Sequence, residues 1–137
     1  MKKLLTLALA IIMLCGMVLP VLAVETEIMP YYNNTARTKA RFQIETTGEA
    51  IVTLTFSGYA SCTTGATLTS KVQKLVSNSW QDVSGASWID EYEGVRTTVQ
   101  HSVQLTSTGT YRLVYEFEIR GTGGDADIIS GTIEDSY

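Results

Sequence analysis

The sequence is poor in the residues that build disulfide frameworks and cysteine–histidine catalytic pairs, with two cysteines and one histidine in 137 residues. His101 lies far from Cys62 in sequence, and nothing beside Cys62 matches a nucleophile motif, which disfavours that chemistry. Proline is equally scarce, and none follows Pro30. No segment beyond Pro30 has convincing helical periodicity, so the absences already point away from a helical fold.

The N-terminus has the pattern of a secretory signal peptide. Two lysines precede an uncharged, mostly apolar run from Leu4 to Val24, which contains the helix-breaking Pro20. A small residue at Ala23 provides a cleavage site, so we expect residues 1–23 to be removed. An uncleaved anchor is the alternative, since about 20 apolar residues suffice to cross a bilayer. Cleavage is favoured, which predicts a protein that is secreted or associated with the cell envelope, without stable membrane insertion.

The mature chain is acidic. Removing 23 residues from 137 leaves 114, and loss of Lys2 and Lys3 leaves 8 Lys and Arg against 14 Asp and Glu, a net charge of −6. This disfavours nucleic acid and anionic lipid as partners, because basic side chains supply most of that affinity. Cys62 is then the one remaining cysteine, which excludes an internal disulfide framework but leaves pairing between chains open.

The rest of the chain is rich in Thr, Val, Ser and Tyr and is broken by Gly and polar clusters about every ten residues, which is typical of an all-β domain. We expect residues 24–35 to form an extended segment and residues 36–137 to form an immunoglobulin-like antiparallel β-sandwich. Residues 84–94 are the least regular part, and a change of apolar phase after Lys74 predicts a bulge there. The expected strands cover residues 36–45, 50–57, 66–76, 80–83, 95–105, 108–119 and 127–133.

The sixth of these segments carries the strongest fold signal. Alternation from Tyr111 to Ile119 places the tyrosines toward the core, and Tyr111 stands where such sandwiches turn a corner and bond a tyrosine hydroxyl to the backbone. Leu113 occupies the position of the immunoglobulin cysteine, so an apolar contact should replace the bridge between sheets. By the same alternation, His101 should be a core histidine with a hydrogen-bond partner.

Four aromatic side chains in or near predicted loops are candidate ligand-binding residues, namely Trp80, Trp88, Tyr92 and Tyr59. Aromatic rings beside carboxylates can stack on the apolar face of a sugar. The interpretation that the two tryptophans cap the open end of the core is favoured over sugar binding, because Trp is highly buried on average.

Charged residues suggest three further kinds of site. Asp90, Glu91 and Glu93 could supply paired carboxylates for hydrolysis of a glycoside, but short loops leave little room for the cleft this needs. Residues 123–127 weakly resemble a calcium loop, although a hairpin turn explains them better, and we predict no metal and no cofactor. The row of Arg37, Lys39 and Arg41 is better explained as charge decoration that discourages an exposed strand from pairing with other chains, and a basic stripe for polyanionic cell-wall polymers is the alternative.

Three short motifs occur together along the chain: Glu27 to Asn33, the hairpin from Val72 to Trp80, and Gly109 to Arg112. In this combination the chain resembles a group of small exported proteins of anaerobic Gram-positive bacteria, which begin with a Glu-Ile-x-Pro-Arg-Tyr-like segment. Tyr31 replaces the arginine of that pattern. The resemblance implies export and a β-sandwich, and it implies no catalytic or binding residue.

The sequence therefore favours a secreted, non-enzymatic β-sandwich that binds a cell-surface glycan or protein. A small carbohydrate-active enzyme and a purely structural envelope component are the alternatives.

Overall fold

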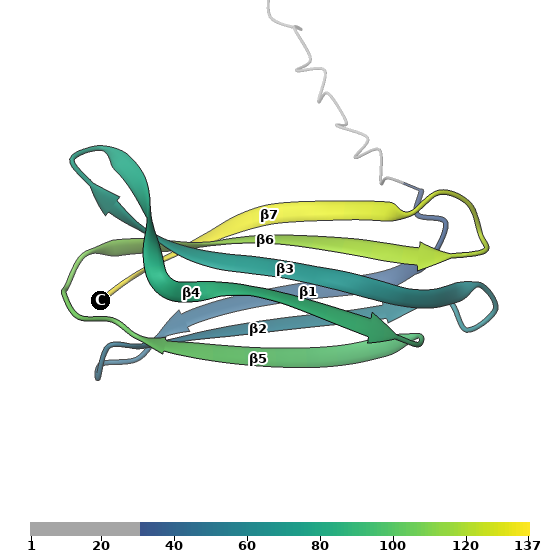
Figure 1. Cartoon of the computed structure of the whole chain (residues 1–137), viewed down its shortest axis with the longest axis horizontal. Helices are drawn as coiled ribbons and strands as arrows, with labels where there is room; N and C mark the ends of the chain where they lie inside the picture. The colour runs from purple at the N-terminus through teal and green to yellow at the C-terminus, as the bar shows by residue number, and fades with distance from the viewer. Residues whose placement is uncertain (1–30) are drawn as a thin grey trace, which may run out of the picture. The chain divides into compact units, whose positions relative to one another are not determined.

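The computed structural model describes residues 31–137, which form an all-β sandwich without helices (Figure 1). The predicted signal peptide and residues 24–30 lie outside the described residues. No helix able to span a membrane occurs between residues 31 and 137. The strands are β1 (Thr35–Ile44), β2 (Glu49–Gly58), β3 (Thr63–Val76), β4 (Ser79–Glu93), β5 (Arg96–Gln104), β6 (Thr110–Gly121) and β7 (Asp127–Ser136).

Two antiparallel sheets pack face to face, one with the order β1-β2-β5 and the other with the order β4-β3-β6-β7. β1 approaches β7 at one edge of the sandwich, and β4 approaches β5 at the other. This architecture confirms the predicted sandwich. It differs from a constant-type immunoglobulin domain in the fourth strand, which pairs here with β3 instead of joining the sheet of β1, β2 and β5.

The core lies between the inner faces of the two sheets, where alternate residues of each strand are buried. β2 contributes four fully buried side chains at every second position from Ala50 to Phe56. The outward residues between them are Thr and Ile, so this strand has the two-residue period that the sequence predicts. The opposing sheet supplies the buried side chains of Ala66, Leu68, Val72, Leu113, Phe117 and Ile119.

The predicted tyrosine corner is confirmed. The Tyr111 side chain is 2% exposed, and its hydroxyl donates a 2.6 Å hydrogen bond to the carbonyl oxygen of Ser107. Leu113 is fully buried in the core, where it makes the apolar contact expected in place of a disulfide. The corner fixes the chain where it passes from β5 to β6, that is, from one sheet to the other.

The predictions for the fourth strand are wrong in extent. In place of a short strand at residues 80–83 and an irregular segment at 84–94, β4 runs continuously from Ser79 to Glu93. The bulge also lies earlier than predicted: residues 83–86 stand opposite Val72 alone, with Gly85 at a φ of +74°. The sequence of β4 does not show the usual alternation of apolar and polar residues, because Ile89 is 70% exposed on the outer face while Asp90 faces inward toward His101.

The start of β1 and the start of β7 are joined by a buried carboxylate. Asp127 accepts hydrogen bonds from the backbone N–H groups of Asn33 (2.9 Å) and Asn34 (2.7 Å) and from the hydroxyl of Thr35 (2.7 Å). Burial alone would raise the pKa of Asp127, but the hydrogen bond from Thr35 and those from the backbone together hold it below its usual value. Residues 122–126 connect the paired strands β6 and β7 as a hairpin, with Asp127 as the first residue of β7, which agrees with the hairpin turn preferred over a calcium loop.

Candidate binding surface

Trp80 lies on the outer face of the four-stranded sheet, near the tip of the β3–β4 hairpin. It pairs across strands with Leu75, and the guanidinium carbon of Arg112 lies 4.3 Å from the centre of its ring. Next to it, hydrogen bonds first from Gln73 and then from Lys71 lower the pKa of Asp82. Because Arg112 lies over the ring, one side of Trp80 is occupied by a cation of its own chain.

Trp88 and Tyr92 lie on the inner side of β4, because the bulge at residues 83–86 reverses which side chains face outward. Trp88 is half-buried and stacks on the ring of His101, with centroids 4.8 Å apart and planes at 5°. Tyr92 makes an edge contact with the buried Phe56 at 6.1 Å and is 37% exposed. Both rings help to close the sandwich where β4 meets β5.

Tyr59 lies in the loop between β2 and β3 and is 45% exposed. The structure does not bring the four predicted aromatic residues onto one surface, since Trp80 and Trp88 point to opposite sides of the same strand. Tyr59 and Tyr92 lie at the same end of the sandwich, as the backbone bonds from Gly58 to Val95 and from Gly94 to Thr64 require. This geometry does not favour a single platform of these four residues that stacks on a sugar.

The three candidate carboxylates are also divided between two faces. Asp90 faces inward, and its Oδ2 lies 2.8 Å from Nε2 of His101, so that histidine has the hydrogen-bond partner expected of it, although its side chain is 22% exposed and lies outside the buried core. Glu91 and Glu93 are exposed on the outer face, where Glu93 approaches Arg120 at 3.5 Å. Within residues 31–137 no cluster of three or more His, Cys, Asp or Glu side chains is arranged to hold a metal ion.

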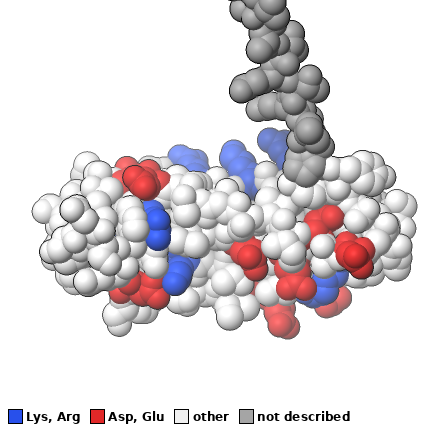
Figure 2. Space-filling model, turned by 90° about the horizontal axis from the view of Figure 1, so that it is seen from above, with Lys and Arg blue, Asp and Glu red and all other residues white. Residues whose placement is uncertain are grey.

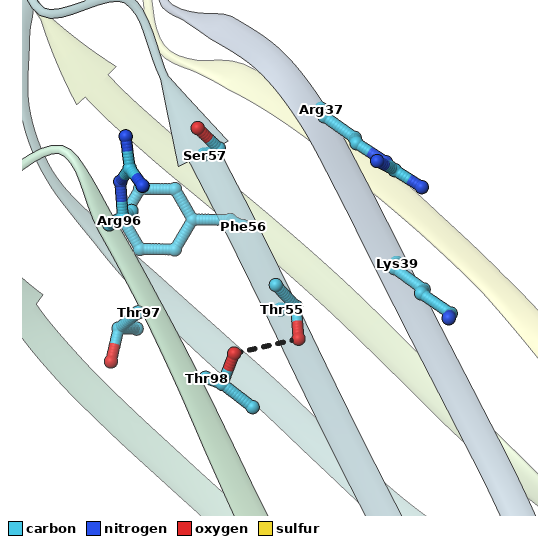
Figure 3. Close-up of a pocket in the computed structure, with 8 residues that line it drawn as sticks. All are labelled: Arg37, Lys39, Thr55, Phe56, Ser57, Arg96, Thr97 and Thr98. Carbon is cyan, nitrogen blue, oxygen red and sulfur yellow. Dashed lines mark hydrogen bonds between the residues drawn. The ribbon is translucent and has the colours of Figure 1, made fainter.

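A groove of about 600 Å³ lies instead on the outer face of the three-stranded sheet (Figure 3). Arg37 and Lys39 from β1 line one side, where their side chains extend away from β2, and Arg96 from β5 lines the other. The hydroxyl side chains of Ser57 and Thr55 lie on β2 between these cations, and that of Thr98 lies on β5 beside Thr55.

Strand pairing sets the order of side chains across this groove. Arg37, Ser57 and Arg96 form one cross-strand row, and Lys39, Thr55 and Thr98 form the next. The hydroxyls of Thr55 and Thr98 are 2.9 Å apart and hydrogen-bonded. A second hollow of about 190 Å³ continues along β2 and is lined by Arg41, Gln43, Ile51, Thr53 and Gln100.

The face that carries both hollows is basic although the chain as a whole has a net charge of −4. Its outward side chains include four cations, Arg37, Lys39, Arg41 and Arg96, and two carboxylates, Glu45 and Glu49, which lie opposite each other at the far end of β1 and β2. Figure 2 shows Lys and Arg side chains in a row along one long edge of the domain and a cluster of Asp and Glu toward the opposite edge. We call the outer face of β1, β2 and β5 the basic face.

The cations of the basic face differ from those on the other sheet in their partners. In the described part of the chain, the Lys and Arg ion pairs are Lys71 with Asp82 and Arg120 with Glu93, both on the four-stranded sheet. Arg37, Lys39 and Arg96 make no ion pair within residues 31–137. Their charge is therefore not neutralised by the domain itself.

Sequence reasoning identified the β1 half of this face but missed Arg96. Alternation along β1 places Arg37, Lys39 and Arg41 on one side, and this is visible without a structure. Arg96 joins them only because β5 pairs with β2. Its outward phase in the predicted strand at residues 95–105 was the one available signal.

Comparisons with known proteins add little. No family model matches the chain, and no curated protein sequence matches it. Among solved structures, a β-glucosidase from Listeria innocua in complex with isofagomine is similar over 69% of this chain, with 10% sequence identity and a TM-score of 0.41. The chain spans 16% of the length of that enzyme.

Proposed function

We propose that this protein is an exported, non-enzymatic binding module that holds an anionic partner on its basic face. The observation that carries the proposal is the groove between Arg37 and Lys39 on one side and Arg96 on the other, with hydroxyl groups between them. Arginine guanidinium groups pair with carboxylate and phosphate oxygens through two parallel hydrogen bonds, and serine and threonine hydroxyls add neutral donors. The predicted signal peptide supports a site of action outside the cell.

Binding is favoured over catalysis by the positions of the candidate acids. A glycosidase needs two carboxyl groups on either side of one bond. Asp90 faces the interior and bonds His101, while Glu91 and Glu93 lie on an exposed outer surface. No such pair lines the groove, whose charged residues are all basic.

Nucleic acid remains a poor candidate for the partner. Proteins that hold single strands combine a basic groove with aromatic side chains on which bases stack. The aromatic residue nearest the groove, Phe56, is fully buried, so the accessible side chains offer hydroxyl and cationic groups but no stacking platform.

Retention on an immobilised polyanion such as dextran sulfate tests the proposal. We expect the purified protein to be retained at low salt and to elute as salt rises, because exposed ion pairs are screened. A triple variant Arg37→Gln, Lys39→Gln, Arg96→Gln should elute much earlier.

The matched control changes the same number of charges on the other sheet: Lys71→Gln, Arg112→Gln, Arg120→Gln. This variant should elute close to the wild type. Thermal unfolding of all three proteins verifies that they are folded. Equal losses in both variants would show that retention reflects net charge and not the basic face.

A further inference from the structure

We propose that the partner is a linear, hydroxyl-rich polyanion that lies extended along β2, with its oxyanions paired to the cations of β1. This inference rests on the proposed function and adds to it the shape of the ligand and the spacing of its charges. A compact anion would use one row of the basic face, whereas a linear one would use the successive rows.

The first argument is the spacing of the cations. Arg37, Lys39 and Arg41 alternate along one regular strand, and each pairs with a successive outward residue of β2. A strand rises by about 3.4 Å per residue, so neighbouring cations stand roughly 7 Å apart, and the three span about 14 Å. A chain with one oxyanion per ~7 Å, or a multiple of that distance, can pair with this row without distortion.

The second argument is the form of the surface. The two hollows follow one another along β2, the first beside Thr55 and Ser57 and the second beside Ile51 and Thr53. β1 and β5 flank β2 on either side, at about 4.8 Å each, so the basic walls are roughly 10 Å apart at the backbone. That width admits a single polymer chain that lies parallel to β2.

The third argument is the chemistry of the neutral side chains that line the two hollows. The hydroxyls of Ser57, Thr55 and Thr98 and the amides of Gln43 and Gln100 can donate and accept hydrogen bonds. Such groups suit the hydroxyls of a sugar or polyol backbone between its charges. The accessible side chains of the two hollows include no aromatic ring that would select a nucleobase.

The face is also asymmetric along its length. Cations flank Ser57 on both sides, whereas Arg41 stands opposite Gln100 and also donates a 2.7 Å hydrogen bond to Gln43. Arg37 and Arg96 should therefore bind the first oxyanion, and Arg41 should contribute only when the ligand is long enough to reach it. This difference separates a linear ligand from a compact one.

Calorimetric titration with inorganic phosphate and with size-graded oligomers of galacturonate and of glycerol phosphate tests the proposal. Affinity should rise with length until the ligand reaches Arg41, the last cation of the β1 row, and then level off. Arg41→Gln should weaken binding of the longer oligomers about two- to fivefold, as expected for loss of an exposed ion pair. It should also reduce the slope of log affinity against log salt concentration by about one. It should leave phosphate binding unchanged, whereas Arg37→Gln should weaken both.

The outcomes separate this inference from the proposed function. Anion binding that depends on Arg37 and Arg96 but not on oligomer length or Arg41 would overturn the linear ligand and leave the anion-binding function standing. Absence of binding to every anion would overturn both. Equal affinity for single-stranded DNA of matched charge would refute the hydroxyl-rich chain, and a preference for galacturonate or glycerol phosphate would identify the oxyanion. If the ligand-free wild-type protein is oligomeric and the Arg37→Gln variant is monomeric, a second copy of this chain covers the face. That result would contradict the proposal.

Discussion

Replacement of the buried Asp127 by alanine should strongly destabilise the domain, because three hydrogen-bond donors lose their acceptor. The hydroxyl of Thr35 and the N–H of Asn34 are buried. The N–H of Asn33 is partly exposed and can donate a hydrogen bond to water instead. An unmet buried donor costs about 1 to 3 kcal/mol, so we expect a loss of about 3 to 5 kcal/mol. This is a large part of the 5 to 15 kcal/mol typical of a whole domain.

Urea unfolding followed by fluorescence measures this loss, and Asp125→Ala provides the control. Asp125 lies in the same turn, is exposed, and contacts Asn34 only through its backbone carbonyl, which the substitution retains. The control should stay within about 0.5 kcal/mol of the wild type. A loss below about 1 kcal/mol for Asp127→Ala would refute the view that this carboxylate joins β1 to β7.

The same carboxylate should make stability depend on pH in the acid range. Because its pKa is lowered in the folded state, its contribution is fully present above the ordinary Asp pKa of about 4 and is lost as the pH falls through the folded value. The wild type should therefore lose stability below about pH 4, and Asp127→Asn should lose less over that range. Equal slopes for the two proteins would contradict the assignment.

Two further predictions concern the corner and the thiol. Tyr111→Phe removes the donor to the Ser107 carbonyl and should cost on the order of 1 kcal/mol in urea unfolding, and an unchanged midpoint would deny the corner its stabilising role. A reducing agent should leave the melting temperature of the monomer unchanged, since Cys62 is the one cysteine of residues 31–137 and is free; a clear drop would reveal a bridge.

The regular strands were predictable because each buries one face and exposes the other. β1, β2, β5 and β6 show this alternation in their side chains, and the tyrosine corner follows from a short pattern ending at Tyr111. β4 was not predictable, because it passes the edge where the two sheets meet. There Asp90 is an inward residue with a histidine partner and Ile89 is outward, so polarity no longer reports which side is buried.

The candidate surface was half predictable for a related reason. Side chains that alternate along one strand can be assigned to one face from the sequence alone, as for Arg37, Lys39 and Arg41. Neighbours across a sheet depend on which strands pair, and nothing local to Arg96 indicates that β5 lies beside β2. The aromatic residues were grouped by closeness in sequence, whereas the bulge in β4 sends Trp80 and Trp88 to opposite sides.

The bond between Asp127 and the start of β1 also constrains when the domain can be completed. Its partners are separated by 92 to 94 positions along a chain of 137 residues. A chain synthesised from its N-terminus provides β1 first and β7 last, and contacts between distant segments form slowly because a long loop must close. The hairpin of β1 and β2 therefore lacks its contacts with β7 until the final strand is in place, and that edge of the sandwich stays open until then.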